Sequence, residues 1–345
     1  MPSTPEAVAE PPLLEARGVT KSFRIPRSES GSTRLRALAG VDLTVRRGET
    51  LGLVGESGCG KSTLARVLLM LERPDGGTVR FGGVDPFTLR GRPLLAWRRR
   101  VQMVFQDPFA SLNPRLTAGE LIGEPWLSHR DLVPRAKRAA RLRELLEMVG
   151  LRAGDADRYP QEFSGGQRQR IGIARALALN PELIVCDEPV SALDLSVQAQ
   201  VLNVLTDLQA ELGVAYVFIS HDLSVVRHVS DRMAVMYLGR VVESGAAEEV
   251  FTAPRHPYTA SLLSAVPRLE PAAEGRPRER IVLEGEVPSP ADPPSGCGFR
   301  TRCWKATDVC AEALPANDLW SDPPASDGRQ HEAACHHPLD PAEAH

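Results

Sequence analysis

The sequence predicts an α/β fold built on a mostly parallel sheet with helices on both faces. Short apolar segments alternate with longer segments of helical periodicity, which is the pattern of parallel strands joined by crossover helices. One apolar segment, residues 50–54, runs into a glycine-rich loop and then into a helical pattern at residues 62–71. A strand, a glycine-rich loop and a helix in that order indicate a phosphate-binding site at the carboxyl end of the strand.

Length, charge and apolar runs limit the kinds of protein that this sequence can encode. The chain has 345 residues, 42% of them hydrophobic, and a formal net charge of -3. The longest apolar runs, residues 214–219 and 233–238, are far shorter than the roughly 20 residues of a membrane span. Residues 1–6 lack a basic flank and an apolar stretch, so we expect a cytosolic chain whose membrane role is peripheral. The Arg-rich residues 90–100 read as a solvated helix, and no nucleic-acid partner is expected.

Further elements follow from the same patterns. Residues 13–24 and 37–45 read as strands of an antiparallel β subdomain, with a polar hairpin loop at 27–33 between them. Residues 117–179 read as helix throughout and predict a helical insertion, with its longest pieces at 135–149 and 167–179.

Alternation of strands and helices resumes after this insertion. Strands are predicted at residues 183–186, 214–220 and 232–238, and helices at 197–212 and 223–229. This spacing extends the parallel sheet.

These patterns divide the chain into three parts. Residues 1–12 are rich in proline and read as a flexible N-terminus, and residues 13–266 form the main domain, with a helical subdomain at about 108–180. Residues 267–345 are rich in Pro and Gly and contain one strand-like stretch at 280–283. We therefore expect a separate C-terminal extension.

The glycine-rich loop matches the GxxxxGK[ST] pattern in the required context between a strand and a helix. Glycines let backbone amides converge on phosphate oxygens, Lys61 supplies positive charge to the outer phosphates, and Ser62 can ligate Mg²⁺. The predicted ATP-binding residues of this loop are Gly55, Glu56, Ser57, Gly58, Cys59, Gly60, Lys61, Ser62 and Thr63.

Two carboxylates end the predicted strand at residues 183–186. Asp187 and Glu188 therefore lie at the strand's carboxyl end, where ligands bind in open α/β sheets. We predict that Asp187 holds Mg²⁺, directly or through water, and that Glu188 polarises the attacking water as general base.

Residues 163–170, Phe-Ser-Gly-Gly-Gln-Arg-Gln-Arg, resemble the signature motif of ATP-binding cassette (ABC) ATPases, and the resemblance extends over residues 13–250. It implies the fold of a P-loop NTPase ABC cassette, with an antiparallel β subdomain and a helical insertion. It also implies that Phe23 stacks on adenine, that Gln106 is the Q-loop glutamine and a further Mg²⁺ contact, and that His221 senses the γ-phosphate as a catalytic residue with Lys61 and Glu188. The implied D-loop consists of Ser191, Ala192, Leu193 and Asp194.

A narrower resemblance concerns residues 104–114 and 256–259, which are similar to segments of the oligopeptide/dipeptide importer ATPases. Residues 162–172 resemble the second of two paired ATPase subunits in that group. The likeness implies an importer of two ATPases, two membrane permeases and an extracytoplasmic solute-binding protein, with this chain at the cytoplasmic face of the membrane. It also implies that permease coupling helices contact residues 109–115 and the helical insertion.

The chain contains one phosphate loop and one signature motif. In the resembled family a nucleotide is held between the loop of one subunit and the signature of another, so a heterodimer with a related ATPase subunit is implied. The residues expected to contact the γ-phosphate at the partner's loop are Ser164, Gly165, Gly166 and Gln167. Ser164 is also a good N-cap for the helix that follows.

Four of the six cysteines lie near the C-terminus, with the spacing C-x5-C-x6-C-x24-C and no CxxC pair. Four thiolates can hold a [4Fe-4S] cluster, whereas a mixed Cys/His Zn²⁺ site with His331, His336 or His337 stays open. The resemblance to peptide-importer ATPases favours iron–sulfur over Zn²⁺. The expected ligands are Cys297, Cys303, Cys310 and Cys335.

The function expected from these features is Mg²⁺-dependent ATP hydrolysis that powers import of dipeptides or oligopeptides. An importer for nickel, glycan fragments or another small solute is the main alternative, because the solute is selected by other subunits. A soluble ABC ATPase acting on ribosomes or DNA usually carries two cassettes or a long coiled-coil insertion, and neither is visible. A module that binds ATP without hydrolysing it is disfavoured because Glu188 and His221 are both present.

Overall fold

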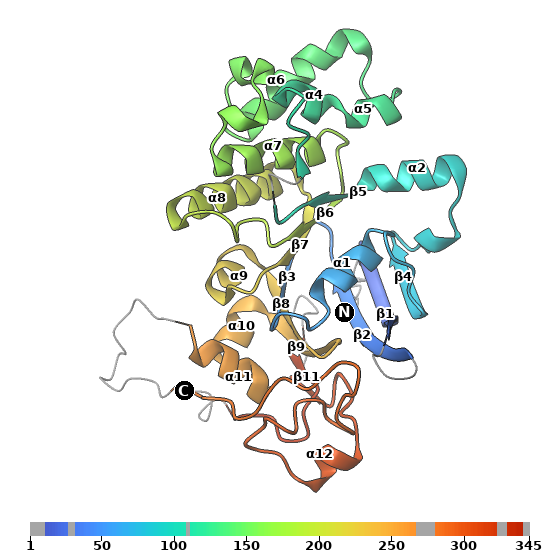
Figure 1. Ribbon diagram of the computed structural model, residues 1–345, viewed down its shortest axis with the longest axis vertical. Helices are drawn as coiled ribbons and strands as arrows, with labels where there is room; N and C mark the ends of the chain where they lie inside the picture. The colour runs from blue at the N-terminus through green and yellow to red at the C-terminus, as the bar shows by residue number, and fades with distance from the viewer. Residues whose placement is uncertain (1–10, 27–31, 108–110, 267–279, 323–329, 341–345) are drawn as a thin grey trace, which may run out of the picture. The chain divides into compact units, whose positions relative to one another are not determined.

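The computed structural model describes residues 11–26, 32–107, 111–266, 280–322 and 330–340 (Figure 1). The chain forms two compact units. Unit 1 consists of Met1–Arg46, Pro74–Pro86 and Tyr237–His345, and unit 2 of Arg47–Arg73 and Phe87–Met236.

A parallel sheet forms the centre of unit 2. Its strands lie in the order β8-β3-β7-β6-β5, and each pair is parallel. Strand β3 is buried along its whole length, because helices cover both faces of the sheet. The strands span Thr50–Val54 (β3), Val101–Val104 (β5), Leu183–Asp187 (β6), Ala215–Ile219 (β7) and Arg232–Tyr237 (β8).

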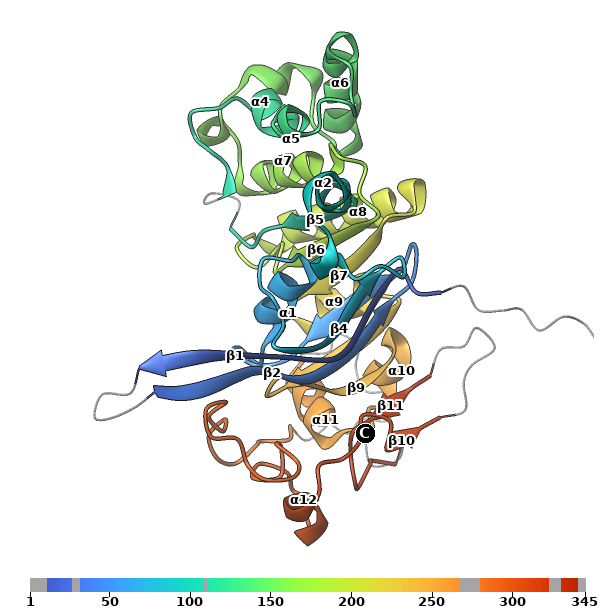
Figure 2. The ribbon, with the colours of Figure 1, turned by 90° about the vertical axis from the view of Figure 1, so that its right-hand side faces the viewer.

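Helices of unit 2 fall into two groups. The helices that connect or flank the strands are α1 (Lys61–Leu68), α2 (Gly91–Arg100), α8 (Leu195–Leu212) and α9 (Leu223–Val229). The others gather at the top of Figure 1, and α7 runs beside α8 in both ribbon views (Figure 2). They are α4 (Ala118–Gly123), α5 (Pro125–Ser128), α6 (Arg138–Met148) and α7 (Gly165–Leu177). This second group is the predicted helical insertion.

Unit 1 contains a three-stranded antiparallel sheet in the order β2-β1-β4 (Figure 2). These strands span Leu14–Pro26 (β1), Ser32–Val45 (β2) and Gly76–Phe81 (β4). A second antiparallel group pairs β9 (Arg240–Ala246) with β11 (Glu332–Ala333), and β11 with β10 (Trp320–Ser321). The helices are α10 (Ala247–Thr252), α11 (Pro257–Ser264) and α12 (Asp308–Glu312).

A buried carboxylate ties the C-terminal segment to β9. Glu243 is 1% exposed and accepts hydrogen bonds from the backbone N–H groups of Arg255 (2.7 Å) and His256 (2.9 Å). Its Oε1 atom also lies 2.8 Å from Nε2 of His331 on the C-terminal segment. Because a buried charge is costly unless it is hydrogen-bonded, these three contacts hold the segments together.

The predicted α/β fold class is confirmed, with differences in detail. Residues 117–179 are not helix throughout, because residues 129–134 and 149–152 lie outside the helices. Helix α7 begins at Gly165, two residues before the predicted start, and β9 was not predicted. The strand expected at residues 280–283 is wrong, because that segment carries no strand pairing. Residues 1–10, 27–31, 108–110 and 267–279 lie outside the described part. They include most of the predicted flexible N-terminus and of the hairpin loop at 27–33, the start of the expected permease contact at 109–115, and the start of the C-terminal extension. Among the described helices, none has the length and apolarity needed to cross a membrane.

Candidate functional site: a phosphate loop facing paired carboxylates

The phosphate loop connects β3 to α1, as predicted. Gly55 has φ +151°, and a Cβ there would lie 2.2 Å from the carbonyl oxygen of Met236, so only glycine fits. Gly60 is the N-cap of α1 and has φ +112°, with no side chain capping the first turn. The first N–H groups of α1 are therefore open to an anion.

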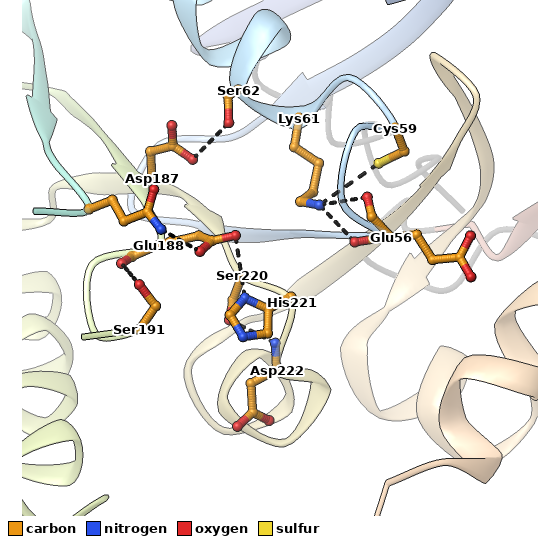
Figure 3. A network of polar contacts seen from close by, with 12 residues as sticks. Glu56, Cys59, Lys61, Ser62, Asp187, Glu188, Ser191, Ser220, His221 and Asp222 are labelled. Atoms are coloured by element: carbon orange, nitrogen blue, oxygen red, sulfur yellow. Dashed lines mark hydrogen bonds and ion pairs between the residues drawn. The ribbon is translucent and has the colours of Figure 1, made fainter. Parts of the chain in front are cut away.

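Lys61 lies inside this loop and is 6% exposed. Its Nζ donates hydrogen bonds to the carbonyl oxygens of Gly55 at 2.7 Å and Glu56 at 3.1 Å (Figure 3). Nζ is also 3.9 Å from Sγ of Cys59, whose pKa is raised by burial. The ammonium group is therefore held where the backbone amides converge, which suits the binding of phosphate oxygens.

Asp187 faces Ser62 across the start of α1. The Ser62 hydroxyl donates to Oδ1 of Asp187 at 3.4 Å, which joins the first turn of α1 to the end of β6 (Figure 3). Burial raises the pKa of Asp187, and the negative charge of Glu188 raises it further, while the Ser62 bond opposes both effects. A hydroxyl and a carboxylate are hard oxygen ligands of the kind that Mg²⁺ prefers. The donor set therefore fits the predicted ion.

Glu188 adopts an unusual backbone conformation for a residue with a side chain, with φ +48°. Its N–H donates to the carbonyl oxygen of Ile219 at 2.9 Å. This strain turns the carboxylate toward two polar partners. Nε2 of Gln106 donates to Oε2 at 3.0 Å, and Nδ1 of His221 lies 3.3 Å from Oε1 (Figure 3). Three residues from separate segments therefore meet, as the sequence-based hypothesis requires.

The signature motif forms the N-terminus of α7. The Ser164 hydroxyl accepts from the N–H of Gln167 at 3.3 Å, and the Gln167 side-chain oxygen accepts from the N–H of Ser164 at 3.0 Å. This reciprocal pair is a capping box. A Cβ on Gly165 would lie 3.1 Å from Leu193 of the D-loop, and one on Gly166 would lie 2.2 Å from Val197. The two glycines therefore allow close packing against the D-loop segment.

Ser191 and Phe23 are two further residues that the sequence predicts to take part in nucleotide binding or hydrolysis. The Ser191 hydroxyl donates to the carbonyl oxygen of Glu188 at 3.1 Å, so the start of the D-loop is anchored to the candidate base. Phe23 lies on β1 in unit 1, with Nζ of Lys21 5.4 Å from its ring centroid. Its role against adenine stays a prediction, as do the catalytic roles of the residues above.

The four C-terminal cysteines are free thiols in the structure. Burial is the main cause that raises the pKa of Cys303 to about 11 and of Cys335 to about 12, and the neighbouring cysteines raise both further. In the described part of the chain, no group of three or more Cys, His, Asp or Glu side chains is arranged to hold a metal ion. The structure therefore does not support the [4Fe-4S] cluster or the Zn²⁺ alternative.

The three histidines considered for a mixed site have other partners. Nε2 of His331 contacts Glu243, Nε2 of His336 contacts the carbonyl oxygen of Ala313 at 3.0 Å, and Nε2 of His337 contacts the hydroxyl of Thr307 at 2.7 Å.

Sequence reasoning did not single out Gln169 and Arg175 on α7. Gln169 is 2% exposed and its Nε2 donates to the carbonyl oxygen of Phe105, the residue before Gln106, at 3.4 Å. Arg175 donates to the carbonyl oxygen of Ser111 at 3.2 Å. Gln169 lies at helical spacing from Gly166 and Ile173, which are buried on the same face of α7. That spacing could have predicted that Gln169 is buried.

Known proteins resemble both the sequence and the fold. The family model described as ABC transporter matches residues 38–191, and the one described as oligopeptide/dipeptide transporter, C-terminal region, matches residues 242–310. The chain is 50% identical over 320 residues to the dipeptide transport ATP-binding protein DppF of Haemophilus influenzae, covering 92% of this chain and 97% of that protein. It is 52% identical over 305 residues to YkfD of Bacillus subtilis, named as an oligopeptide transport ATP-binding protein, covering 88% and 91%.

A solved structure shares the fold. The dimeric ATP-binding cassette MJ0796 in a post-hydrolysis state, bound to ADP and Pi, matches with a TM-score of 0.59 and 32% identity, covering 68% of this chain and 98% of that one. Together with the phosphate loop, these similarities define an ATP-binding cassette ATPase. The chain belongs to the ABC transporter family, and its C-terminal region is of the oligopeptide/dipeptide transporter type. The resemblance seen in the sequence is therefore confirmed.

Proposed function

We propose that this ATPase powers import of dipeptides or oligopeptides through a membrane permease. The observation that carries ATP hydrolysis is the Glu188 carboxylate, held between Gln106 and His221 beside the Ser62–Asp187 pair. The peptide cargo is supported by the C-terminal family match and by the names of the relatives. Nickel, a glycan fragment or another solute is the alternative cargo, which uptake measurements distinguish.

The binding of ATP follows from the loop geometry. The open N–H groups at the start of α1 and the Lys61 ammonium receive the β- and γ-phosphate oxygens. Ser62 and Asp187, with Gln106 beside them, would hold Mg²⁺, which neutralises charge on the β- and γ-oxygens when bound. Lys61 exchanges its two carbonyl contacts for phosphate contacts in this step. Phe23 would stack on the adenine ring.

Hydrolysis requires a base that takes a proton from water. Glu188 is suited to this role because Gln106 donates to its carboxylate and His221 lies beside it, so the side chain is held in place. The contact of Nδ1 of His221 with Glu188 leaves Nε2 of the same ring available: in the neutral ring with Nδ1 protonated it accepts a hydrogen bond from the water, and in the protonated ring it donates to the γ-phosphate. His221 therefore links the state of the nucleotide to the position of the base.

Each nucleotide would be held between two ATPase chains. The capping box of Ser164 and Gln167 presents the N-terminus of α7 as an anion site, which supports contact with the γ-phosphate at a partner's loop. We propose a related, non-identical subunit as this partner. Two permease subunits and an extracytoplasmic solute-binding protein complete the proposed importer, and the chain acts at the cytoplasmic face of the membrane.

A cavity in unit 2 is suited to contact with the permease. It has a volume of about 470 Å³ and is lined by Leu71, Phe105 and Leu112, among others. Leu71 is 64% exposed and Phe105 is 48% exposed, so apolar surface is open here. Gln169 and Arg175 of α7 also line this cavity and bond to the chain on either side of residues 108–110. A permease helix seated here would therefore act on the segment that contains Gln106.

Import is tested by co-purification and uptake. The tagged chain is isolated anaerobically from membranes of its host in mild detergent, and its partners are identified by mass spectrometry. Recovery of two permeases and a second ATPase, together with loss of radiolabelled dipeptide uptake in a Glu188→Gln strain, is expected. The Glu144→Gln strain, altered at an exposed carboxylate of α6, is the matched control. Recovery from the soluble fraction alone, or loss of nickel uptake instead, would overturn the proposed transport or its cargo.

The same preparation tests the metal expectation at the cysteines. A [4Fe-4S] cluster or Zn²⁺ held by Cys297, Cys303, Cys310 and Cys335 remains a proposal, and its support is the mutual electrostatic influence of these four thiols. Iron and acid-labile sulfide in near-equal amounts would support the cluster. Stoichiometric zinc without iron would favour the alternative, and neither metal would reject both.

A further inference from the structure

A cavity of about 420 Å³ lies within unit 1, apart from the residues assigned to ATP. Its walls come from β2, from the start of β9 and from the loop at residues 290–299. The volume falls in the range of sites for small organic ligands, which is roughly 300–1,000 Å³. Cys297, one of the four cysteines discussed above, also lines the cavity.

One wall of the cavity is aromatic and closely packed. The rings of Tyr237 and Phe299 meet edge to face, with centroids 5.3 Å apart at 85°. Phe299 also contacts Tyr258 at 5.4 Å and is 1% exposed in the protein as a whole. Such interlocked rings are buried and rigid. The apolar lining that a ligand can reach includes the exposed Leu314 and the partly exposed Leu238, on which a flat or branched apolar group can pack.

The loop that carries Phe299 is fixed by its backbone. Gly296 has φ +61°, and a Cβ there would lie 2.4 Å from the carbonyl oxygen of Cys310. The N–H of Cys297 donates to that same oxygen at 2.8 Å. The cavity is therefore preformed, and a ligand would not have to order this wall.

The other side of the cavity carries two guanidinium groups. Arg36 lies on β2 and Arg240 begins β9, and both line the space. Neither guanidinium group has a hydrogen-bond or ion-pair partner among the residues that the structure describes. Partial burial lowers the pKa of Arg240, and the charge of Arg36 lowers it further, although Asp42 opposes this effect. Asp42 itself accepts hydrogen bonds from the N–H of Gly18 at 2.7 Å and from the Asn317 side chain.

We propose that this cavity binds a small organic carboxylate, whose anionic group pairs with Arg36 and Arg240 while its apolar body packs on Leu238 and Leu314. A guanidinium fork matches the two oxygens of a carboxylate, and such charge-assisted bonds are strong where water is partly excluded. The anion also relieves the repulsion between two like charges at a half-buried position. An uncharged ligand of the same shape lacks both effects, so the site discriminates by charge.

The test compares N-acetyl-4-fluorophenylalanine with its primary amide, which has the same apolar body and no negative charge. Binding of each probe to the full chain is followed by ¹⁹F NMR titration up to about 5 mM. The carboxylate is expected to bind at least about tenfold more tightly than the amide. Replacement Arg240→Met is expected to weaken carboxylate binding at least about tenfold and to leave amide binding within about twofold.

Controls keep the outcome unambiguous. Arg80→Met removes an exposed Arg from β4 that does not line the cavity, and it should bind both probes as the unaltered chain does. Arg36→Met removes the exposed member of the pair and provides a second variant should Arg240→Met fail to fold. Retained binding of a fluorescent ATP analogue reports folding of each variant. No carboxylate binding, equal affinity for acid and amide, or unchanged affinity in both cavity variants would overturn the proposal.

Discussion

Replacing Glu188 by Gln tests the assignment of the general base. The carboxylate accepts from Gln106 at 3.0 Å and faces Nδ1 of His221 at 3.3 Å. An amide has the same shape, keeps one oxygen for Gln106 and cannot take a proton from water. Removal of a general base typically lowers turnover about a hundredfold to ten-thousandfold. That range corresponds to about 3–5.5 kcal/mol of barrier.

ATP binding should survive this change, because the phosphate contacts come from the loop and from Lys61. The expected result of Glu188→Gln is therefore an unchanged dissociation constant for ATP and a loss of phosphate release at saturating ATP. ATP should remain trapped in a closed dimer, seen as an increase in mass by light scattering. The Glu144→Gln protein should keep normal turnover. Normal turnover in Glu188→Gln would refute the base assignment, and a parallel loss of ATP binding would show a structural role instead.

Three other changes test separate parts of the chain. Lys61→Ala should weaken ATP binding at least about tenfold, as measured with a fluorescent ATP analogue, because the outer phosphates lose their cation. Asp187→Asn should abolish Mg²⁺ stimulation. Because burial raises the pKa of Asp187, its charged form at pH 7 costs folding free energy, so the metal-free Asp187→Asn protein should be more stable than the unaltered chain in urea unfolding at that pH. Glu243→Ala should lower the free energy of unfolding by about 3–5 kcal/mol in the same assay, because two buried N–H groups and His331 lose their acceptor. The control is Glu249→Ala, which alters an exposed carboxylate. A loss below about 1 kcal/mol in Glu243→Ala would contradict the reasoning.

The sequence alone predicted those elements whose apolar residues recur with the period of a strand or a helix. Strand β3 and helix α9 lie at the predicted residues, because their apolar spacing and the turns beside them depend on near neighbours alone. The same holds for the phosphate loop, where the glycines reflect backbone geometry. Helix α7 begins earlier than its apolar pattern, because Ser164 caps two glycines that propensity alone would place outside a helix.

Pairing between strands that are far apart in the sequence could not be predicted from local sequence patterns. Strand β11 adds to β9 from about 90 residues away, and tertiary contacts such as the buried Glu243–His331 pair hold this short strand there. The left-handed conformation of Glu188 likewise depends on a bond to Ile219 of the neighbouring strand. At the cysteines, the four-Cys pattern left iron–sulfur and Zn²⁺ open and the family resemblance favoured a cluster, but burial and the partners of the nearby histidines come from tertiary structure.

The contacts of Glu188 connect the candidate base to the signature motif of the same chain. Ser191 bonds to the carbonyl oxygen of Glu188 at 3.1 Å, and Leu193, two residues later, approaches Gly165 so closely that a Cβ would lie 3.1 Å away. Base, D-loop and signature thus form a continuous packed path. In the proposed dimer the base serves the ATP of its own chain, while the signature serves the ATP of the partner. A change at one nucleotide should therefore reach the other through this path, which requires no separate communicating element.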